Sequence, residues 1–205
     1  MEFTVLIPVY NTKAHNLLTA VDSVLRQTIG AKYKTLIVDD ASTDAGTLAA
    51  LKYLQTLPDV EVVSMPENKG SAAARNYGIS LIDTEYVALM DSDDVSHPDR
   101  FKRQWEYIQQ HKPDVLGCNL FSFYDKDIQR TSIFRSKHKE VPDYNDGWMV
   151  NQGTVFMRKQ AVVEAGGYNE ALRRAQDIDL WKRLYKRGET LRNITDVLYG
   201  WRRYK

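Results

Sequence analysis

The sequence predicts an α/β fold in which a mostly parallel sheet is flanked by helices. Short apolar runs, typical of buried strands, alternate with segments of helical period over the first hundred residues. Several of these runs end in polar or acidic residues, as strands do at the ligand-binding edge of such a sheet. A length of 205 residues with 43% hydrophobic content suits one domain with a sizeable core. We therefore expect a single domain over residues 1–205.

Four strand–helix units account for the first half of the chain. Apolar runs predict its strands at 3–7, 35–38, 60–64 and 86–90. Asn11 or Thr12 is expected to cap the helix after the first strand, and Asp44 the helix after the second. Gly70 supplies a turn before an alanine-rich helix that runs to about residue 81. Together these units make a Rossmann-like half-sheet.

The second half of the chain has a weaker pattern. Its predicted elements are, in order, a helix from 98 to about 111, strands at 115–123 and 154–157, a short helix, a Gly166-Gly167 turn and a helix over about 177–187. Gly188 stops the last helix. Residues 125–147 are polar and have no clear period, which predicts a loop or a mobile flap.

Composition and charge argue against several classes of protein. A net charge of +1 does not suit a nucleic-acid footprint over the whole surface, and no segment approaches the roughly 18 apolar residues of a membrane span. The first residues lack the basic region of a secretion signal, and the single cysteine, Cys118, cannot form an internal disulfide, so we expect a cytoplasmic protein. Residues 173–205 hold ten Lys or Arg against four Asp or Glu. This excess suits diphosphates, a phospholipid-linked acceptor or peripheral contact with the inner face of a membrane, and equally a solvated helix face.

Three carboxylates lie within four residues at the end of the fourth predicted strand. Asp91, Asp93 and Asp94 raise one another's pKa unless a cation lies among them, and the usual occupant is a divalent ion with oxygen ligands. Mg²⁺ or Mn²⁺ at such a site commonly bridges to substrate phosphates, which indicates a phosphate-bearing substrate. The alternative is a solvated acidic loop or a helix cap.

Other polar strand ends are expected to share this edge of the sheet, because the carboxyl ends of parallel strands converge. Tyr10 can stack on a base, and Asp39 can accept from a base imide or bind a ribose hydroxyl, which predicts a nucleoside site. Arg75, on the first turns of the third helix, can pair with the acidic cluster or with a diphosphate. The segment 39–44 also fits a plain turn with a helix cap at Asp44.

Asp177, at the start of the last predicted helix, is the best candidate for a general base. The backbone amides of a helix N-terminus are expected to keep its pKa low. It would then be a weak base in water, but a sufficient one beside a developing oxocarbenium ion and an acceptor hydroxyl. The alternative is that Asp177 only caps the helix.

Taken in order, five motifs resemble those of the inverting glycosyltransferases of family 2, which have the GT-A fold. They are Ile7-Pro8-Val9-Tyr10-Asn11, Val38-Asp39-Asp40-Ala41-Ser42-Thr43-Asp44, Asn68-Lys69-Gly70 with Ala74-Arg75-Asn76-Tyr77-Gly78, Asp91-Ser92-Asp93-Asp94 with Pro98, and Gly166-Gly167-Tyr168-Asn169-Glu170 before Gln176-Asp177. The resemblance covers roughly residues 3–187. It implies metal-assisted transfer from a nucleotide-diphosphosugar, a UDP-sugar being favoured, to a hydroxyl of a glycan, glycolipid or protein. We accordingly divide the chain into a nucleotide-binding half, 1–98, and an acceptor-binding half, 99–205, with a mobile segment at about 125–150.

The resemblance also implies roles for single residues. Asp177 would be the catalytic base, and Mn²⁺ or Mg²⁺ would be held by Asp93 as the main ligand and by Asp91. The implied donor-binding residues are Pro8, Tyr10, Asn11, Asp39, Arg75, Asp91, Asp94 and Arg202, the last within a segment that resembles the family's Tyr-x-x-Arg motif. The residues placed at the acceptor are Trp148, Gln176 and Trp181. Gln176 stands where the family usually has Glu.

Two other functions compete with this one. A catalytically inactive subunit or sensor that binds a nucleotide-sugar would keep the donor site, but the intact Asp93 and Asp177 argue against loss of turnover. A nucleotidyltransferase of similar topology would be expected to have a glycine-rich and basic first loop. Residues 8–13 contain no glycine.

Overall fold

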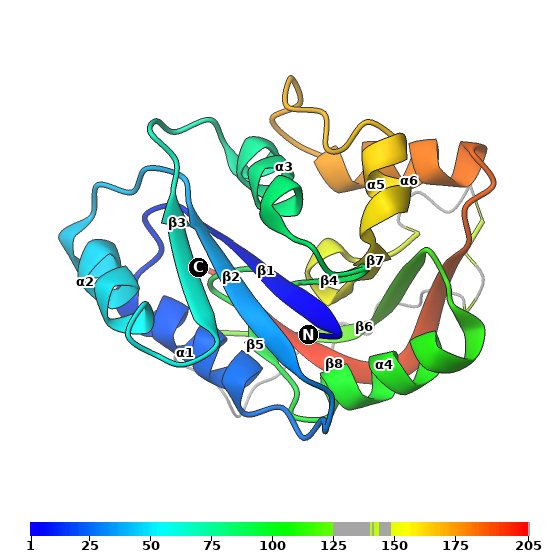
Figure 1. Ribbon diagram of the computed structural model, residues 1–205, viewed down its shortest axis with the longest axis horizontal. Helices are drawn as coiled ribbons and strands as arrows, with labels where there is room; N and C mark the ends of the chain where they lie inside the picture. Colours follow the sequence, from blue (N-terminus) through cyan, green and yellow to red (C-terminus); the bar gives the residue numbers. More distant parts are fainter. Residues whose placement is uncertain (125–139, 141, 144–148, 205) are drawn as a thin grey trace.

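A mixed sheet forms the centre of the computed structural model, which describes residues 1–124, 140, 142–143 and 149–204. Within these residues eight strands are hydrogen-bonded in the order β3-β2-β1-β4-β7-β6-β8-β5 (Figure 1). The strands are β1 (Phe3–Val9), β2 (Tyr33–Asp39), β3 (Val60–Ser64), β4 (Tyr86–Leu89), β5 (Val95–Ser96), β6 (Val115–Phe123), β7 (Phe156–Arg158) and β8 (Leu191–Arg202). The helices are α1 (Ala14–Leu25), α2 (Ala45–Leu54), α3 (Ser71–Leu81), α4 (Arg100–His111), α5 (Lys159–Glu164) and α6 (Gln176–Lys186), with a 3-10 turn at Gln152–Thr154. The predicted α/β class with flanking helices is confirmed.

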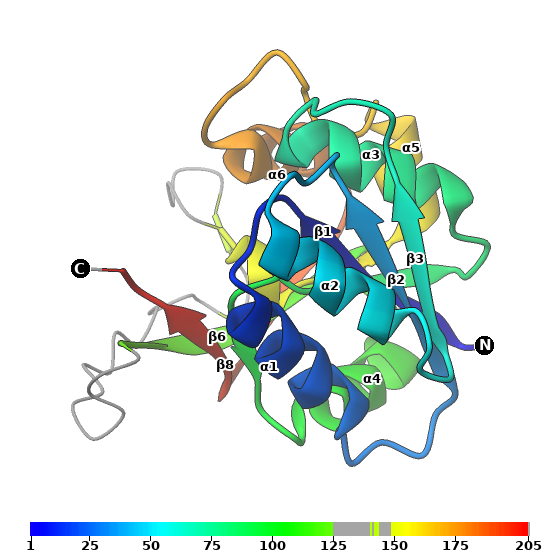
Figure 2. The ribbon, with the colours of Figure 1, turned by 90° about the vertical axis from the view of Figure 1, so that its left-hand side faces the viewer.

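Helices cover both faces of the sheet because its strands carry apolar side chains on both sides. In β1, Phe3, Val5 and Ile7 belong to one core with residues of α1, α2 and α4. Leu6 belongs to a second core with residues of α3, α5 and α6. The two groups of helices lie on opposite faces (Figures 1 and 2). Since successive side chains of a strand point to opposite faces, the uninterrupted apolar run of β1 suits burial on both sides.

Strands β1, β2, β3 and β4 are parallel, so their carboxyl ends meet at one edge of the sheet. Two turn residues shape the loops there as predicted. Asp44 caps α2 by accepting from the Thr47 N–H at 2.8 Å, and Gly70 adopts a left-handed backbone (φ +89°) immediately before α3. These loops set the positions of the polar strand ends.

The predicted cap of α1 is wrong. Its N-cap residue is Lys13, which makes no side-chain capping bond. Asn11 has a left-handed backbone (φ +48°), and its side-chain oxygen accepts from the N–H groups of Thr43 and Asp44. Asn11 therefore ties the loop after β1 to the loop after β2 instead of capping a helix.

The longest strand, β8, was missing from the sequence prediction. Its residues mix charged and apolar side chains, and buried and exposed positions follow no regular alternation, so no period marks them. β8 is held by its neighbours: it pairs in parallel with β6, with a register shift around Asn119, and antiparallel with the short β5. The last residues of β8 contact the loop that follows β4.

Two further expectations concern less regular parts of the chain. The predicted loop at 125–147, and most of the mobile segment at about 125–150, fall outside the described residues. In the parts of the chain that the structure describes, no helix combines the length and apolarity of a membrane span.

Candidate active site

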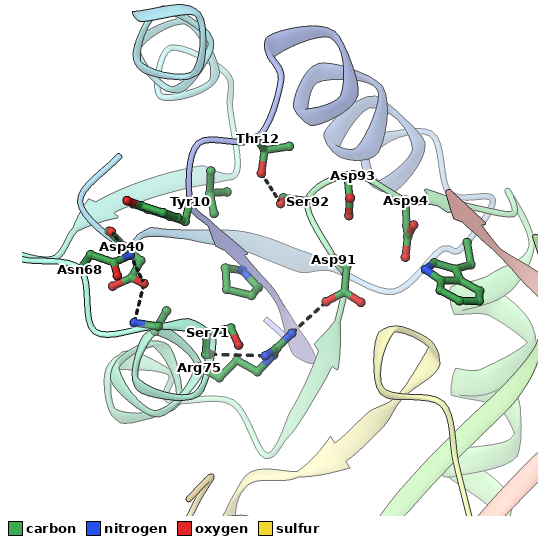
Figure 3. A pocket seen from close by; sticks show the side chains of 15 residues that line it. Tyr10, Thr12, Asp40, Asn68, Ser71, Arg75, Asp91, Ser92, Asp93 and Asp94 are labelled. Atoms are coloured by element: carbon green, nitrogen blue, oxygen red, sulfur yellow. Dashed lines mark hydrogen bonds and ion pairs between the residues drawn. The ribbon is translucent and has the colours of Figure 1, made fainter. Parts of the chain in front are cut away.

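A pocket of about 370 Å³ opens at the carboxyl ends of β1, β2 and β4. Figure 3 shows side chains from loops far apart in the sequence pointing into it. Its described lining residues are Pro8, Val9, Tyr10, Thr12, Asp40, Asn68, Gly70, Ser71, Ala74, Arg75, Asp91, Ser92, Asp93, Asp94 and Trp201. Six residues that the sequence predicted for donor or metal binding are among them. The volume falls within the usual range of roughly 300–1,000 Å³ for small-molecule sites.

Two carboxylates of the acidic loop, residues 91–94, have one clear partner each. Asp91 accepts from Arg75 Nη2 at 2.9 Å. Asp93 Oδ2 accepts from the hydroxyl of Tyr204 at 2.7 Å. Burial raises the pKa of Asp93, and the charge of Asp91 adds to this, against the opposing effect of the Tyr204 hydrogen bond.

The third carboxylate, that of Asp94, anchors the acidic loop to β8. Asp94 is 2% exposed and accepts from the Tyr199 hydroxyl and from the Arg202 N–H, both at 2.7 Å. Burial, followed by the charge of Asp91, raises the pKa of Asp94 well above its usual value. Among the described residues, the three acids of this loop therefore share a single ion pair, that of Asp91 with Arg75.

Arg75 is the cationic side chain among the described lining residues, and it is 7% exposed. Besides its ion pair with Asp91, its Cζ lies 5.7 Å from the centre of the Tyr168 ring. In the amide orientation that satisfies both groups, Gln152 accepts from Arg75 Nε at 2.7 Å. The guanidinium is thus fixed beside the acidic loop, where it can meet an anionic ligand.

The strand end of β2 presents Asp40 to the pocket, not the predicted Asp39. Asp39 accepts from the Ser42 N–H at 3.0 Å and from the Ser64 hydroxyl at 3.2 Å, and it does not line the pocket. Adjacent side chains on a strand point in opposite directions, so the next residue, Asp40, faces the cavity. Asp40 accepts from the N–H groups of residues 69 and 70 and from Asn68 Nδ2.

The strand end of β1 brings two of its three predicted donor-binding residues to the pocket. Pro8 and Tyr10 line the pocket, and Tyr10 is 50% exposed, so its ring is available to a base. Asn11 does not line the pocket, because its side chain holds the loop after β2. Thr12 joins this strand end to the acidic loop through a 2.7 Å contact between its hydroxyl and that of Ser92.

Asp177 lies in the first turn of α6, within electrostatic reach of Arg75 and Asp91. Burial raises the pKa of Asp177 more than the local backbone N–H groups and Arg75 lower it. The expectation of a low pKa is therefore wrong, because desolvation outweighs the helix N-terminus. The capping alternative is also wrong, since the N-cap residue is Ala175.

The turn before α6 is docked on α3, which explains one of the sequence motifs. Asn76 accepts from the Tyr168 N–H at 2.8 Å and donates to the Tyr168 carbonyl at 2.9 Å and to Glu170 at 2.7 Å. Gly167 has a left-handed backbone (φ +68°), and a Cβ there would lie 2.7 Å from Asn76 Oδ1. This close fit positions the segment that leads to Asp177.

The three residues predicted for the acceptor have different outcomes. Gln176 lies beside the pocket, where its Oε1 accepts from the Ser71 hydroxyl at 3.0 Å. Trp181 is 0% exposed in the core under α6, so its assignment to the acceptor is wrong. Its spacing on an amphipathic helix already suited a core position. Trp148 lies outside the described residues.

A second cavity, of about 160 Å³, adjoins the first through Asp91, Asp94 and Trp201. Its other described lining residues are Leu120, Asn151, Gln152, Gly153 and Tyr199. Asn151 is 9% exposed, and its Nδ2 has no hydrogen-bond partner among the described residues. Trp201 is 39% exposed. An unpaired amide and an open indole are groups that a sugar ring can use.

Arg202 is not among the described lining residues of the pocket. Its Nε donates to the Asp93 carbonyl at 2.5 Å, and its Cζ lies 4.8 Å from the centre of the Phe123 ring. The structure therefore does not bring this predicted donor-binding residue into the pocket. Arg202 holds the acidic loop through these backbone contacts, from outside the pocket.

Asp93 and Asp91 fit a divalent ion that takes its remaining ligands from elsewhere. Both carboxylates line the pocket, and hard oxygen atoms are the ligands that Mg²⁺ and Mn²⁺ prefer. Among the described residues no group of three or more His, Cys, Asp or Glu side chains is placed to hold an ion by itself. An ion here would need donor phosphates and water to complete its coordination.

Several pocket residues were not singled out from the sequence. Asp40 lay in a recognised motif, and only the direction of its side chain decides between it and Asp39. Asn68 and Ser71 flank Gly70, and their polar side chains before a helix were the available signal. Trp201 lay within the segment that resembles the Tyr-x-x-Arg motif, but the strand that brings its side chain to the pocket was not predicted.

Known proteins resemble this chain in sequence. A sequence profile of glycosyl transferase family 2 matches residues 4–167. The amylovoran biosynthesis glycosyltransferase AmsE of Erwinia amylovora is 30% identical over 199 residues, which cover 96% of this chain and 74% of AmsE.

Solved structures share its fold. S. aureus TarS 1–349 in complex with UDP superposes with a TM-score of 0.81 at 22% identity, over 99% of this chain and 61% of that one. The mannosyltransferase PcManGT of Pyrobaculum calidifontis, in complex with GDP-Man and Mn²⁺, gives a TM-score of 0.74 at 19% identity, over 97% and 56%. The chain thus spans less than two thirds of either solved protein.

Proposed function

The chain belongs to glycosyl transferase family 2, and on that basis we propose that this glycosyltransferase moves a sugar from a nucleotide-diphosphosugar to an acceptor hydroxyl with inversion. The proposed donor is a UDP-sugar and the proposed acceptor a glycan or glycolipid. The observation that carries the proposal is the pocket lined by Arg75 and the acidic loop, with Asp177 close enough to interact electrostatically with Arg75 and Asp91, although it is not among the described lining residues. A cation, carboxylates and a half-buried base suit transfer from a diphosphosugar.

In the proposed complex, the nucleoside lies at the ends of β1 and β2. Tyr10 offers a ring face to the base, and Asp40 takes over the role first predicted for Asp39. Arg75 lies between this region and Asp91, where its guanidinium can bind the diphosphate. The UDP complex of TarS, which shares the fold, supports a nucleotide as the ligand.

Asp177 is the proposed general base. It takes the proton of the acceptor hydroxyl, and the hydroxyl oxygen forms a bond to the anomeric carbon on the face opposite the diphosphate. The bond from that carbon to the diphosphate oxygen breaks, and the diphosphate leaves with the electron pair. Because burial raises the pKa of Asp177, it is a stronger base than an exposed aspartate.

Mn²⁺ or Mg²⁺ held by Asp93 and Asp91 would stabilise the negative charge of the leaving diphosphate. Asp94 orients this loop through Tyr199 and Arg202. The second cavity, with its open indole and unpaired Asn151 amide, is the proposed place for a sugar ring, and Gln176 stays a proposed acceptor contact.

A thermal-shift panel tests the donor site. We expect UDP with Mn²⁺ to raise the melting temperature more than GDP, CDP or dTDP does. At about a hundred times its dissociation constant, a ligand stabilises by roughly 2.7 kcal/mol, or several degrees for a chain of this size. The shift should disappear in Asp93→Asn and persist in Asp83→Asn, whose side chain is 84% exposed on the surface. No shift with any nucleotide would overturn the proposal.

A turnover assay separates the enzyme from an inactive nucleotide-binding subunit. UDP release from UDP-glucose and UDP-N-acetylglucosamine should be measurable with wild type, alone or with acceptor extracts, and should be lost in Asp177→Asn. UDP binding should survive in that variant. Binding without any turnover in wild type would favour the inactive subunit.

A further inference from the structure

Arg100, the first residue of α4, is a charged side chain that the proposed chemistry does not use directly. It is 0% exposed, and no carboxylate lies within ion-pair distance of it among the described residues. A guanidinium keeps its charge in proteins, and burying a charge without a paired partner costs free energy. Its position in the fold therefore calls for an explanation.

Hydrogen bonds fix the guanidinium in one orientation. Arg100 Nε donates to Gln104 Oε1 at 3.0 Å, and Gln104 in turn donates to the carbonyls of Leu116 and Thr154 at 3.1 and 2.8 Å. Arg100 Nη2 donates to the Leu89 carbonyl at 2.9 Å. Leu89 ends β4 and stands two residues before Asp91, so this bond holds the entry to the acidic loop.

A second contact reaches the other end of the acidic loop. Arg100 Cζ lies 5.2 Å from the centre of the Tyr199 ring. The Tyr199 hydroxyl donates to Asp94 Oδ2 at 2.7 Å and accepts from the Asp91 N–H at 3.2 Å. Gly153 leaves room for this hydroxyl, since a Cβ there would lie 2.3 Å from it. Arg100 thus supports the loop at its entry and, through one aromatic ring, at Asp91 and Asp94.

We propose that Arg100 is a positioning residue of the donor site, which holds the acidic loop, through Leu89 and Tyr199, in the geometry that binds a diphosphate with its cation. The proposal rests on the proposed function. Arg100 lines neither cavity, so it acts through the loop and not on the ligand. The planar guanidinium contacts the Leu89 carbonyl and the Tyr199 ring at the same time in a fixed geometry, which the single ammonium group of lysine cannot do.

Isothermal titration of UDP in the presence of Mn²⁺ tests this proposal with three variants. Arg100→Lys keeps the charge but loses the fork. Tyr199→Phe removes only the hydroxyl that joins Asp94 to Asp91. Arg158→Lys is the matched control, because Arg158 pairs with Asp114 and Glu189 at the opposite edge of the sheet. For each variant, a cooperative thermal unfolding curve first shows that the protein is folded at the temperature of the titration.

We expect the UDP dissociation constant to rise about tenfold or more in Arg100→Lys, and several-fold in Tyr199→Phe. Arg158→Lys should bind as wild type does, although its melting temperature falls. A folded Arg100→Lys that binds within about twofold of wild type would overturn the proposal. So would an equal loss in Arg158→Lys, since affinity would then follow global stability.

Two further outcomes are decisive. If Arg100→Lys does not fold, Tyr199→Phe decides, and an unchanged dissociation constant in that variant overturns the proposal. A wild-type protein that binds no UDP overturns the proposed donor, and this inference with it. Binding retained by both variants overturns the inference alone.

Discussion

Carboxylates gather at both edges of the sheet, and the two groups are built in opposite ways. At the carboxyl edge of β4, the acidic loop has one ion pair within the described residues, from Asp91 to Arg75. At the amino edge, Asp114 and Glu189 share Arg158, and Arg187 lies 3.7 Å from Glu189. Among the described residues, two of the three carboxylates at the first edge have no ion pair, whereas both carboxylates at the second edge have one.

The pKa values of Asp93, Asp94 and Asp114 follow this difference, whereas burial and the neighbouring Asp114 raise the pKa of Glu189. Burial alone would raise the pKa of Asp114, but the Thr190 N–H and Arg158 lower it below its usual value. In the acidic loop, burial and mutual repulsion raise the pKa of Asp93 and of Asp94. The paired network at the amino edge stabilises the fold, whereas the acidic loop keeps a repulsion that a bound cation can relieve. Sites of function commonly cost stability in this way.

The largest effect is expected on turnover, when the proposed general base is replaced. Asp177→Asn should lower the turnover number about 10²- to 10⁴-fold, because the acceptor hydroxyl loses its base. The dissociation constant for UDP with Mn²⁺ should stay near that of wild type. Asp179→Asn is the matched control on the same helix, since Asp179 pairs with Arg183 at 2.8 Å, and it should keep turnover. Turnover of Asp177→Asn above a tenth of the wild-type value would remove Asp177 from the mechanism.

At the amino edge the expected loss is in stability. Asp114→Ala removes an acceptor from Arg158 Nε at 2.6 Å and from the Thr190 N–H at 2.7 Å. We expect the free energy of unfolding, measured in urea, to fall by about 2–3 kcal/mol, because hydrogen bonds to a charged group are lost. Asp83→Ala, an exposed carboxylate, should change it by no more than about 0.5 kcal/mol. A change in UDP affinity of folded Asp114→Ala would contradict the separation of the two edges.

The two edges should also differ in pH dependence. The folded-state pKa of Asp94 lies above its unfolded value, so the folded state binds more protons between the two and stability rises as pH falls through that window. Asp94→Asn should raise stability at pH 7 and flatten this rise. The stability contributed by Asp114 depends on pH in the opposite direction. It is present above the unfolded-state pKa of about 3.9, and it is lost as pH falls through the lowered folded-state pKa.

Urea unfolding at pH 7 and pH 5 checks the prediction for Asp94, and unfolding at about pH 3 checks the loss expected from Asp114, which occurs below about 3.9. The stabilisation by Asp94→Asn should be smaller than the loss in Asp114→Ala. An Asp94→Asn protein that is less stable than wild type at pH 7 would show that the Tyr199 and Arg202 contacts outweigh the repulsion.

The parts of the fold that the sequence predicted are those where a local pattern and the tertiary structure agree. β1 to β4 are apolar runs bounded by polar loops, and Asp44 and Gly70 act within their own turns. β8 could not be predicted in this way, because its charged residues break the pattern and pairing with β6 supplies the order. Without β8, the role of Tyr199 and Arg202 as anchors of the acidic loop could not be predicted.

The site shows the same division. Motifs placed Arg75, Asp91 and Asp93 around one pocket, since strand ends of a parallel sheet must meet. The choice between Asp39 and Asp40 depends on the direction of one side chain, which an acidic pair in a sequence does not reveal. Trp181 was misassigned because an aromatic residue near a base suits an acceptor site and a core equally well.

The smallest effect is expected at the most exposed contact of the acidic loop. Tyr204 is 57% exposed, and its hydroxyl donates to Asp93 Oδ2 at 2.7 Å and accepts from Asn16 Nδ2 at 3.1 Å. Tyr204→Phe should lower the free energy of unfolding by no more than about 1 kcal/mol, because water can replace the hydroxyl. The same change frees an oxygen of Asp93, so Mn²⁺, titrated with UDP present, should bind about twofold more tightly. Tyr53→Phe, an equally exposed tyrosine on α2, should change neither quantity. A tenfold loss of Mn²⁺ affinity in Tyr204→Phe would mean that this hydroxyl orients Asp93 for the ion, and the acidic loop would then be less deficient in partners than the comparison with Asp114 implies.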